Sequence, residues 1–169
     1  AKFLFEQFGV DINNVGLPFL VIFVMADAGS LLGGLASGAL IKKGWTINKA
    51  RKITLLVNAI IILPVALVSV VESKWIAVFL IGLGAMGHQS WSINSYTLVP
   101  DVFPKKATAS VIGIGKMVGV AIAIVADISL GAVLDQADNS GYFWAFIIAG
   151  FSYIFILGFV HLLMPRMIP

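Results

Sequence analysis

Two charged residues interrupt long apolar stretches of this sequence, the carboxylate of Asp27 and the ammonium of Lys116. A charged group at bilayer depth costs several kcal/mol, so such groups rarely face lipid and usually line a path for a substrate or an ion. An ammonium in a cavity of low dielectric attracts a carboxylate strongly, because water no longer screens the two charges. The types and positions of Asp27 and Lys116 therefore indicate transport through a membrane.

A polar stripe follows one side of the apolar stretch at 75–99. At ~100° per residue, its members fall within about 160° of a helix surface. They are His88, Gln89, Trp91, Ser92, Ser95 and Tyr96. Hydrocarbon does not accept such a stripe, so it must face other helices or a water-filled cavity. Its amide and hydroxyl groups suit a hydroxylated solute, and Trp91 or Tyr96 could stack on a sugar ring. The alternative is hydrogen bonding that only holds helices together.

Three of these residues have two interpretations each. Lys116 either binds a substrate carboxylate or extends its flexible stem to the membrane surface. Asp27 either bonds to a neighbouring helix or carries a proton, because burial favours the protonated form of a carboxylate. His88 is a candidate proton relay or anion contact. The neighbouring Gly115 and Gly119 favour the binding interpretation of Lys116, and for Asp27 the structural interpretation is slightly favoured.

The composition predicts an integral membrane protein. Hydrophobic residues make up 60% of the chain and charged residues 11%, and the mean hydropathy is +1.03. Runs of about twenty apolar residues are long enough to cross a hydrocarbon core of ~30 Å. We expect five helical spans, at about 15–41, 53–71, 75–99, 107–134 and 141–163, in one all-α bundle covering 15–169.

Several function classes do not fit the sequence. Without Cys, neither a thiolate metal site nor a cysteine nucleophile can form. The two histidines lie on different spans, and no hydrolase, zinc-protease or nucleotide-loop motif is present. The basic residues lie between the apolar runs, where they set orientation instead of binding nucleic acid. We therefore expect no enzyme, no cofactor, no metal site and no nucleic-acid partner.

The distribution of basic residues predicts the topology. Eight of the 11 Lys and Arg residues fall between spans one and two, between spans three and four, or after span five. By the positive-inside rule this side is cytoplasmic. Residue 1 is then outside, residue 169 is cytoplasmic, and residues 1–14 form an extracytoplasmic segment. Because an odd number of spans fits poorly with an outside start that lacks a signal sequence, we expect at least one further span before residue 1.

Small residues recur at four-residue spacing in two of the spans. Such spacing lets helix backbones approach closely where dispersion drives association. The first span carries Gly29, Ser30, Gly33, Gly34, Ser37 and Gly38, and the fourth carries Gly113, Gly115, Gly119, Ala123 and Ala126. We expect both stretches to be packing faces.

Two segments resemble a known family. GSLLGGLASGALIKKGWTINKARK, at 29–52, resembles the loop motif between helices eight and nine of the major facilitator superfamily. GHQSWSINSYTLVPDVFPKKATASVIGIGKMVG, at 87–119, resembles helices ten and eleven of its anion:cation symporters, in particular the hexuronate and related sugar-acid transporters. The resemblance implies a fold in which the five spans are helices eight to twelve, most of a C-terminal six-helix bundle.

The resemblance also implies an activity, namely proton-coupled symport of an organic anion, most often a hexuronate or related sugar acid, by alternating access in a bacterial inner membrane. The matching substrate positions are Ser95, Tyr96 and Lys116, followed by Trp91 and Gln89. Lys116 stands where the family more often has Asn or Gly, and a second positive group there would favour a dianion. The implied partners are the anion, a proton, the bilayer and an N-terminal half outside this chain. The alternatives are a symporter portion for another organic anion and a membrane scaffold without transport activity.

Overall fold

The computed structural model describes residues 2–11, 13–136 and 140–165, and within them every regular element is a helix. The elements are α1 (Lys2–Phe8), α2 (Gly16–Lys42), α3 (Ile47–Ile62), the 3₁₀ helix η1 (Leu63–Val70), α4 (Lys74–Val102), α5 (Lys105–Gln136) and α6 (Ser140–Leu163). Among the described residues, five stretches are long and apolar enough to cross a membrane, namely 16–42, 47–70, 74–102, 105–132 and 141–163. The expected all-α, multi-pass membrane fold is confirmed.

The turn from α2 to α3 is set by local sequence. Gly44 has φ of 90°, a left-handed conformation that glycine adopts without a steric penalty. Thr46 then caps α3, because its hydroxyl accepts a hydrogen bond from the backbone N–H of Lys49. Helix α3 therefore begins at Ile47 and not at residue 53, and its basic residues lie on its first turns. Pro64 cannot donate a backbone hydrogen bond, and the span continues beyond it as η1.

Helices α2 and α4 pack closely over two glycines. A β carbon at Gly29 would overlap the backbone of Met86, and one at Gly33 would overlap Ser90. Ser37, one turn further along α2, is also buried. The expected packing face on the first span is therefore confirmed, and it directs α2 onto α4.

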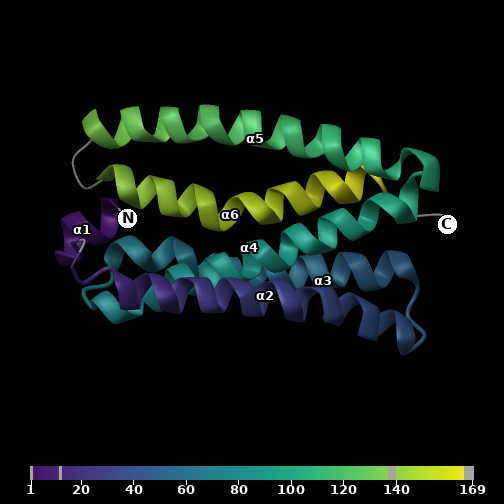
Figure 1. The fold of residues 1–169 in the computed structure, drawn as a ribbon, viewed down its shortest axis with the longest axis horizontal. Coiled ribbons are helices and arrows are strands. Elements are labelled where there is room, and N and C mark those ends of the chain that lie inside the picture. Colours follow the sequence, from purple (N-terminus) through teal and green to yellow (C-terminus); the bar gives the residue numbers. More distant parts are fainter. Residues whose placement is uncertain (1, 12, 137–139, 166–169) are drawn as a thin grey trace.

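Helix α3 packs against α4, and α6 packs against η1. Gly87 of α4 lies against Asn58 and Ile62 of α3, and Gly150 of α6 lies against Leu63 and Ala66 of η1. Helix α1 is tied to α6 by a hydrogen bond from the Tyr142 hydroxyl to Glu6 Oε2, 2.5 Å long. Figure 1 shows α2, α3 and α4 lying together with α6 beside them.

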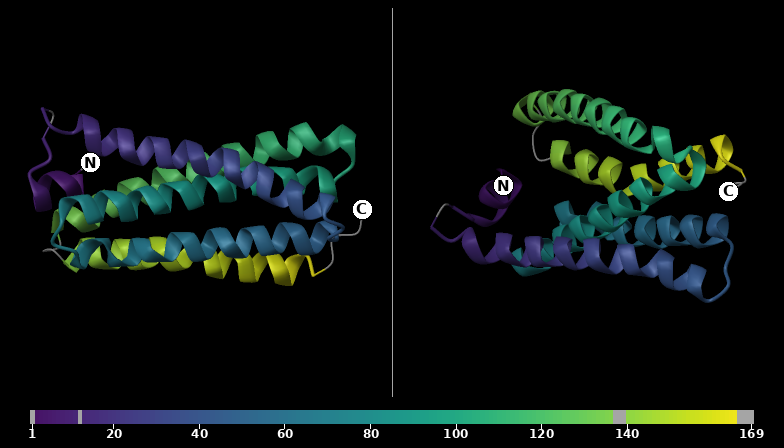
Figure 2. Two further views of the ribbon diagram at one scale, coloured as in Figure 1. Left: turned by 90° about the horizontal axis from the view of Figure 1, so that it is seen from below. Right: turned by 45° about the vertical axis from the view of Figure 1, so that its right-hand side comes forward.

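Helix α5 is the least packed element. It runs along the outside of the bundle, and the views in Figure 2 agree on this position. None of its described side chains is buried. Gly113, Gly115 and Gly119 have nothing within 4 Å of an added β carbon. No described residue reaches these glycines, so the expected packing face on the fourth span stays a prediction.

We predict that Gly29→Ala destabilises the bundle by about 1–3 kcal/mol, because the added methyl forces α2 away from the backbone of α4. Gly38→Ala is the matched control, since it changes the same helix where a β carbon meets nothing within 4 Å. Thermal unfolding of the protein in detergent measures both. Equal melting temperatures for the two variants would contradict the packing described here.

Candidate functional site

A cationic pocket lies between α4 and α5. The Nζ of Lys116 on α5 is 4.7 Å from the ring centroid of Tyr96 on α4. These two residues line a cavity of about 390 Å³ with Gly115, Gly119, Val120 and Ala123. The glycines leave space beside the ammonium, and no acidic residue lines the cavity. The pocket can therefore receive an anion, with Tyr96 placed to contact an apolar ring face.

The turn between α4 and α5 brings the two residues of this pocket together. Helix α4 ends at Val102, and α5 begins at Lys105 after Phe103 and Pro104. A connection this short makes the two helices antiparallel neighbours, so a residue shortly before the turn faces one shortly after it. The ammonium of Lys116 therefore lies over the Tyr96 ring, between α4 and α5.

His88 and Trp91 face a different helix. His88 Nδ1 lies 2.5 Å from the Tyr153 hydroxyl of α6, and the Trp91 and Tyr153 rings meet edge to face at 5.2 Å. Trp91 is buried with Leu55, Ala59 and Leu98. The polar stripe expected from the sequence is thus divided between two neighbouring helices.

Tyr153 is a residue that the sequence analysis missed. Helix α6 is apolar on every side, so no periodicity marks one of its residues. Its side-chain type could have indicated Tyr153, because a phenol within a membrane span needs a hydrogen-bond partner.

Gln89 and Ser95 are half-buried on α4. Their side chains make no hydrogen bond to any other residue in the described part of the chain. An amide and a hydroxyl in this state keep their donors and acceptors for a ligand. They lie on the same helix as Tyr96, whose ring contacts Lys116 of α5.

Asp27 is exposed on α2. Its carboxylate has no hydrogen bond or ion pair with residues 2–11, 13–136 or 140–165. Neither the bond to a neighbouring helix nor the burial on which the proton-carrier interpretation rests is present within the described bundle. Asp127 is exposed on α5 in the same way.

A polar network joins the basic ends of three helices. Arg51 of α3 donates from Nε to Asp101 Oδ2 of α4 at 2.9 Å, and from Nη1 to Ser37 Oγ of α2 at 2.7 Å. Both charged side chains are largely buried, at 13% and 18% exposed. In the sequence Arg51 is one of the basic residues between spans one and two, whereas in the structure it connects α2, α3 and α4.

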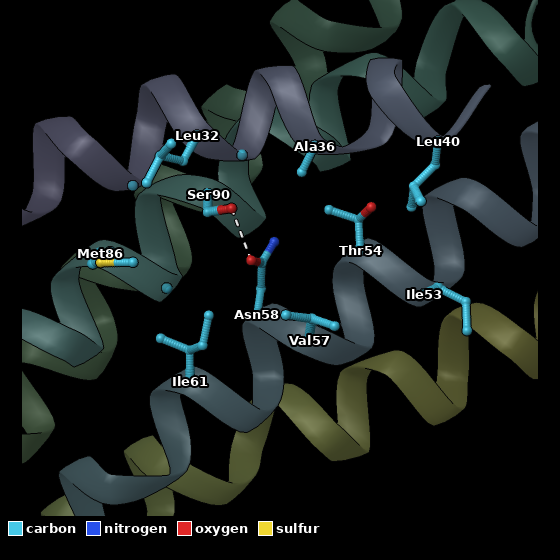
Figure 3. Close-up of a pocket in the computed structure, with 13 residues that line it drawn as sticks. Leu32, Ala36, Leu40, Ile53, Thr54, Val57, Asn58, Ile61, Met86 and Ser90 are labelled. Carbon is cyan, nitrogen blue, oxygen red and sulfur yellow. Dashed lines mark hydrogen bonds between the residues drawn. The ribbon is translucent and has the colours of Figure 1, made fainter. Parts of the chain in front are cut away.

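A second cavity, of about 340 Å³, lies between α2, α3 and α4 (Figure 3). The Ser90 hydroxyl donates to Asn58 Oδ1 at 2.8 Å, and the two side chains face each other in the figure. The rest of the lining is almost wholly apolar and has no charged residue. A sugar acid would leave its charge and hydroxyls unmatched here, so the pocket at Lys116 is the better anion site.

The fold and the pocket define a multi-pass membrane protein with a cationic cavity, and the chain is similar to transporters of sugar acids. It is 23% identical over 161 residues to "Probable galactarate/D-glucarate transporter GarP" of Escherichia coli (strain K12), covering 92% of this chain and 36% of that protein. It is 22% identical over 164 residues to "Probable galactarate/D-glucarate transporter GudP" of Pseudomonas putida, covering 94% and 36%. It is 23% identical over 143 residues to the hexuronate transporter of Escherichia coli (strain K12), covering 83% and 33%.

The chain thus spans about a third of the length of these curated relatives. No family model matches it. No solved structure matches it either.

We predict that Tyr153→Phe removes the hydrogen bond to His88 and lowers stability by about 1 kcal/mol, the usual net value of one such bond. Nitrogen NMR of the imidazoles measures the effect directly, because the Nδ1 resonance of His88 should shift. His161 is the internal control, since it lies at the far end of α6. An unchanged His88 signal would contradict the contact.

Proposed function

We propose that this chain is the C-terminal part of a proton-coupled symporter of the major facilitator type, comprising helices eight to twelve. In this proposal the whole protein takes up a sugar acid, a hexuronate or an aldarate such as galactarate, across a bacterial inner membrane. The sugar-acid relatives support the substrate class, and the five membrane-length helices support the architecture. The observation that carries the proposal is Lys116, an ammonium lining an accessible cavity with a tyrosine ring beside it.

Lys116 and Tyr96 bind the sugar acid in this proposal. Lys116 donates hydrogen bonds to a carboxylate, where exclusion of water strengthens the attraction. Tyr96 lies against the sugar ring, and the free amide of Gln89 and hydroxyl of Ser95 bind its hydroxyl groups. The hydroxyl groups of the sugar are assigned to Gln89 and Ser95 because the side chains of these two residues make no hydrogen bond within the described part of the chain.

His88 and Trp91 have supporting roles in the proposal. Trp91 is 8% exposed and packs on Tyr153, so it fixes the position of α4 more than it contacts a substrate. His88 is exposed and is oriented by the Tyr153 hydroxyl. An oriented imidazole can accept and release a proton within the span, and His88 is therefore a proton-coupling residue together with Asp27.

The charge of the pocket favours a dianion. A hexuronate has one carboxylate and an aldarate has two. Lys116 supplies a positive group on helix α5, and an N-terminal half would have its own groups for a second carboxylate. Two separated cationic contacts match the two ends of an aldarate.

Alternating access requires two bundles that move against each other around a central site. The exposed side chains of α5 and the polar groups of α4 form one wall of that site in the proposal. The other wall belongs to a part of the transporter outside this chain. Transport must therefore be assayed with the protein encoded by the longest natural reading frame that contains these residues.

We predict that Lys116→Ala weakens binding of galactarate by about tenfold or more, because a hydrogen bond to a charged group contributes roughly 1.5–3 kcal/mol. Binding of the uncharged diamide of galactarate should change much less. Competition against labelled galactarate measures both. Equal weakening of acid and amide would remove Lys116 from the carboxylate site, and Lys106→Ala, outside the cavity, controls for a general loss of positive charge.

We predict that Asp27→Asn abolishes accumulation driven by a pH gradient while substrate exchange continues. The amide keeps the size of the carboxylate but cannot bind and release a proton. Uptake and counterflow assays in proteoliposomes separate the two activities. Accumulation at the wild-type level would exclude Asp27 from proton coupling, and Asp127→Asn is the matched control.

A further inference from the structure

A groove of about 650 Å³ runs between α3 and α6, away from the pocket at Lys116. Its polar end contains Lys49, Lys52 and His161, and its inner part is lined by apolar residues such as Leu56 and Leu162. Leu56 is 40% exposed and Leu162 is 76% exposed. The groove therefore joins a basic end to an open apolar surface.

The basic end lies at the helix ends. Lys49 and Lys52 lie on the first turns of α3, and His161 lies on the last turn of α6. In a membrane this is the level of the lipid headgroups, and the apolar part of the groove extends from it toward the acyl chains. Trp45, whose ring lies 4.6 Å from Lys49 Nζ, is an aromatic residue typical of that interface.

The two lysines contribute in different ways. Lys52 Nζ donates hydrogen bonds to the carbonyl oxygens of Met164 at 2.7 Å and Pro165 at 3.0 Å. Its ammonium therefore caps the C-terminal end of α6. It also lies 3.3 Å from His161 Nδ1. An ammonium can only donate, so His161 Nδ1 is the acceptor in this contact. Lys49 is exposed, and no described carboxylate forms an ion pair with it.

We propose that this groove binds an anionic phospholipid, with the phosphate at Lys49 and an acyl chain along the apolar surface of α3 and α6. Charge complementarity supports this occupant, because the groove has positive charge at one end and no acidic residue in its lining. Basic pockets between helices at a membrane surface are suited to anionic headgroups. A free sugar acid fits less well, since its hydroxyl groups would meet Leu56, Leu157 and Leu162.

Native mass spectrometry tests the proposal with phosphatidylglycerol and phosphatidylcholine of identical acyl chains. The full-length protein that contains this chain should retain phosphatidylglycerol in preference. Lys49→Gln should lower that preference about fivefold, as expected for one basic group at an anionic surface. Lys43→Gln, a basic residue at the end of α2 outside the groove, should leave it unchanged.

Gly158→Phe tests the acyl-chain part of the groove. Gly158 lines the groove and has nothing within 4 Å of an added β carbon, so the ring can occupy the space of a lipid chain without displacing the helix. Retention of both lipids should fall, whereas Gly113→Phe on α5 should not change it. Equal retention of the two lipids by the wild-type protein would overturn the proposal. Release of phosphatidylglycerol by inorganic phosphate would also overturn it, in favour of a free-anion site.

Discussion

The contact between α2 and α4 determines how the other helices can be placed. Gly33 has no side chain, so α4 approaches closely enough for Asn94 Nδ2 to donate to the Gly33 carbonyl oxygen at 2.9 Å. Asn94 is fully buried and also donates to the Ser90 carbonyl oxygen. Dispersion alone holds apolar helices in lipid weakly, and a buried hydrogen bond adds direction to their contact. The contact between Gly33 and Asn94 therefore fixes both the distance of α4 from α2 and the rotation of α4 about its axis.

Once α4 is fixed in rotation, each of its faces has a separate use. Ser90 and Asn94 face α2 and α3, while Trp91 and His88 face Tyr153 of α6. Tyr96 is left to contact Lys116 of α5. The contacts of α4 with α2, α3, α5 and α6 thus lie on different faces of one helix.

The sequence predicted the helices better than their contacts. Apolar length identifies five spans because hydrocarbon requires an internally hydrogen-bonded helix at each crossing. The sequence also indicated Lys116 and Tyr96 as site residues, and the structure brings them together. It did not indicate Tyr153, since a uniformly apolar helix has no pattern that marks one face. It also predicted packing at Gly113, Gly115 and Gly119, which no described residue reaches, because small residues indicate where a close approach is possible and not which neighbour makes it.

The placement of charge distinguishes the surfaces that can face lipid. Inside the membrane, α2 and α5 carry Asp27, Lys116 and Asp127, all exposed in the bundle. Exposure of these groups to hydrocarbon would cost several kcal/mol each, so their surroundings must be polar or must contain a partner. Helix α6, and α3 from Ile53 onward, carry no Asp, Glu, Lys or Arg within the bundle. Their exposed Leu and Ile side chains can contact lipid at no such cost. The two sides of the described bundle are therefore chemically different, and the side formed by α3 and α6 contacts the bilayer without burying a charge in hydrocarbon.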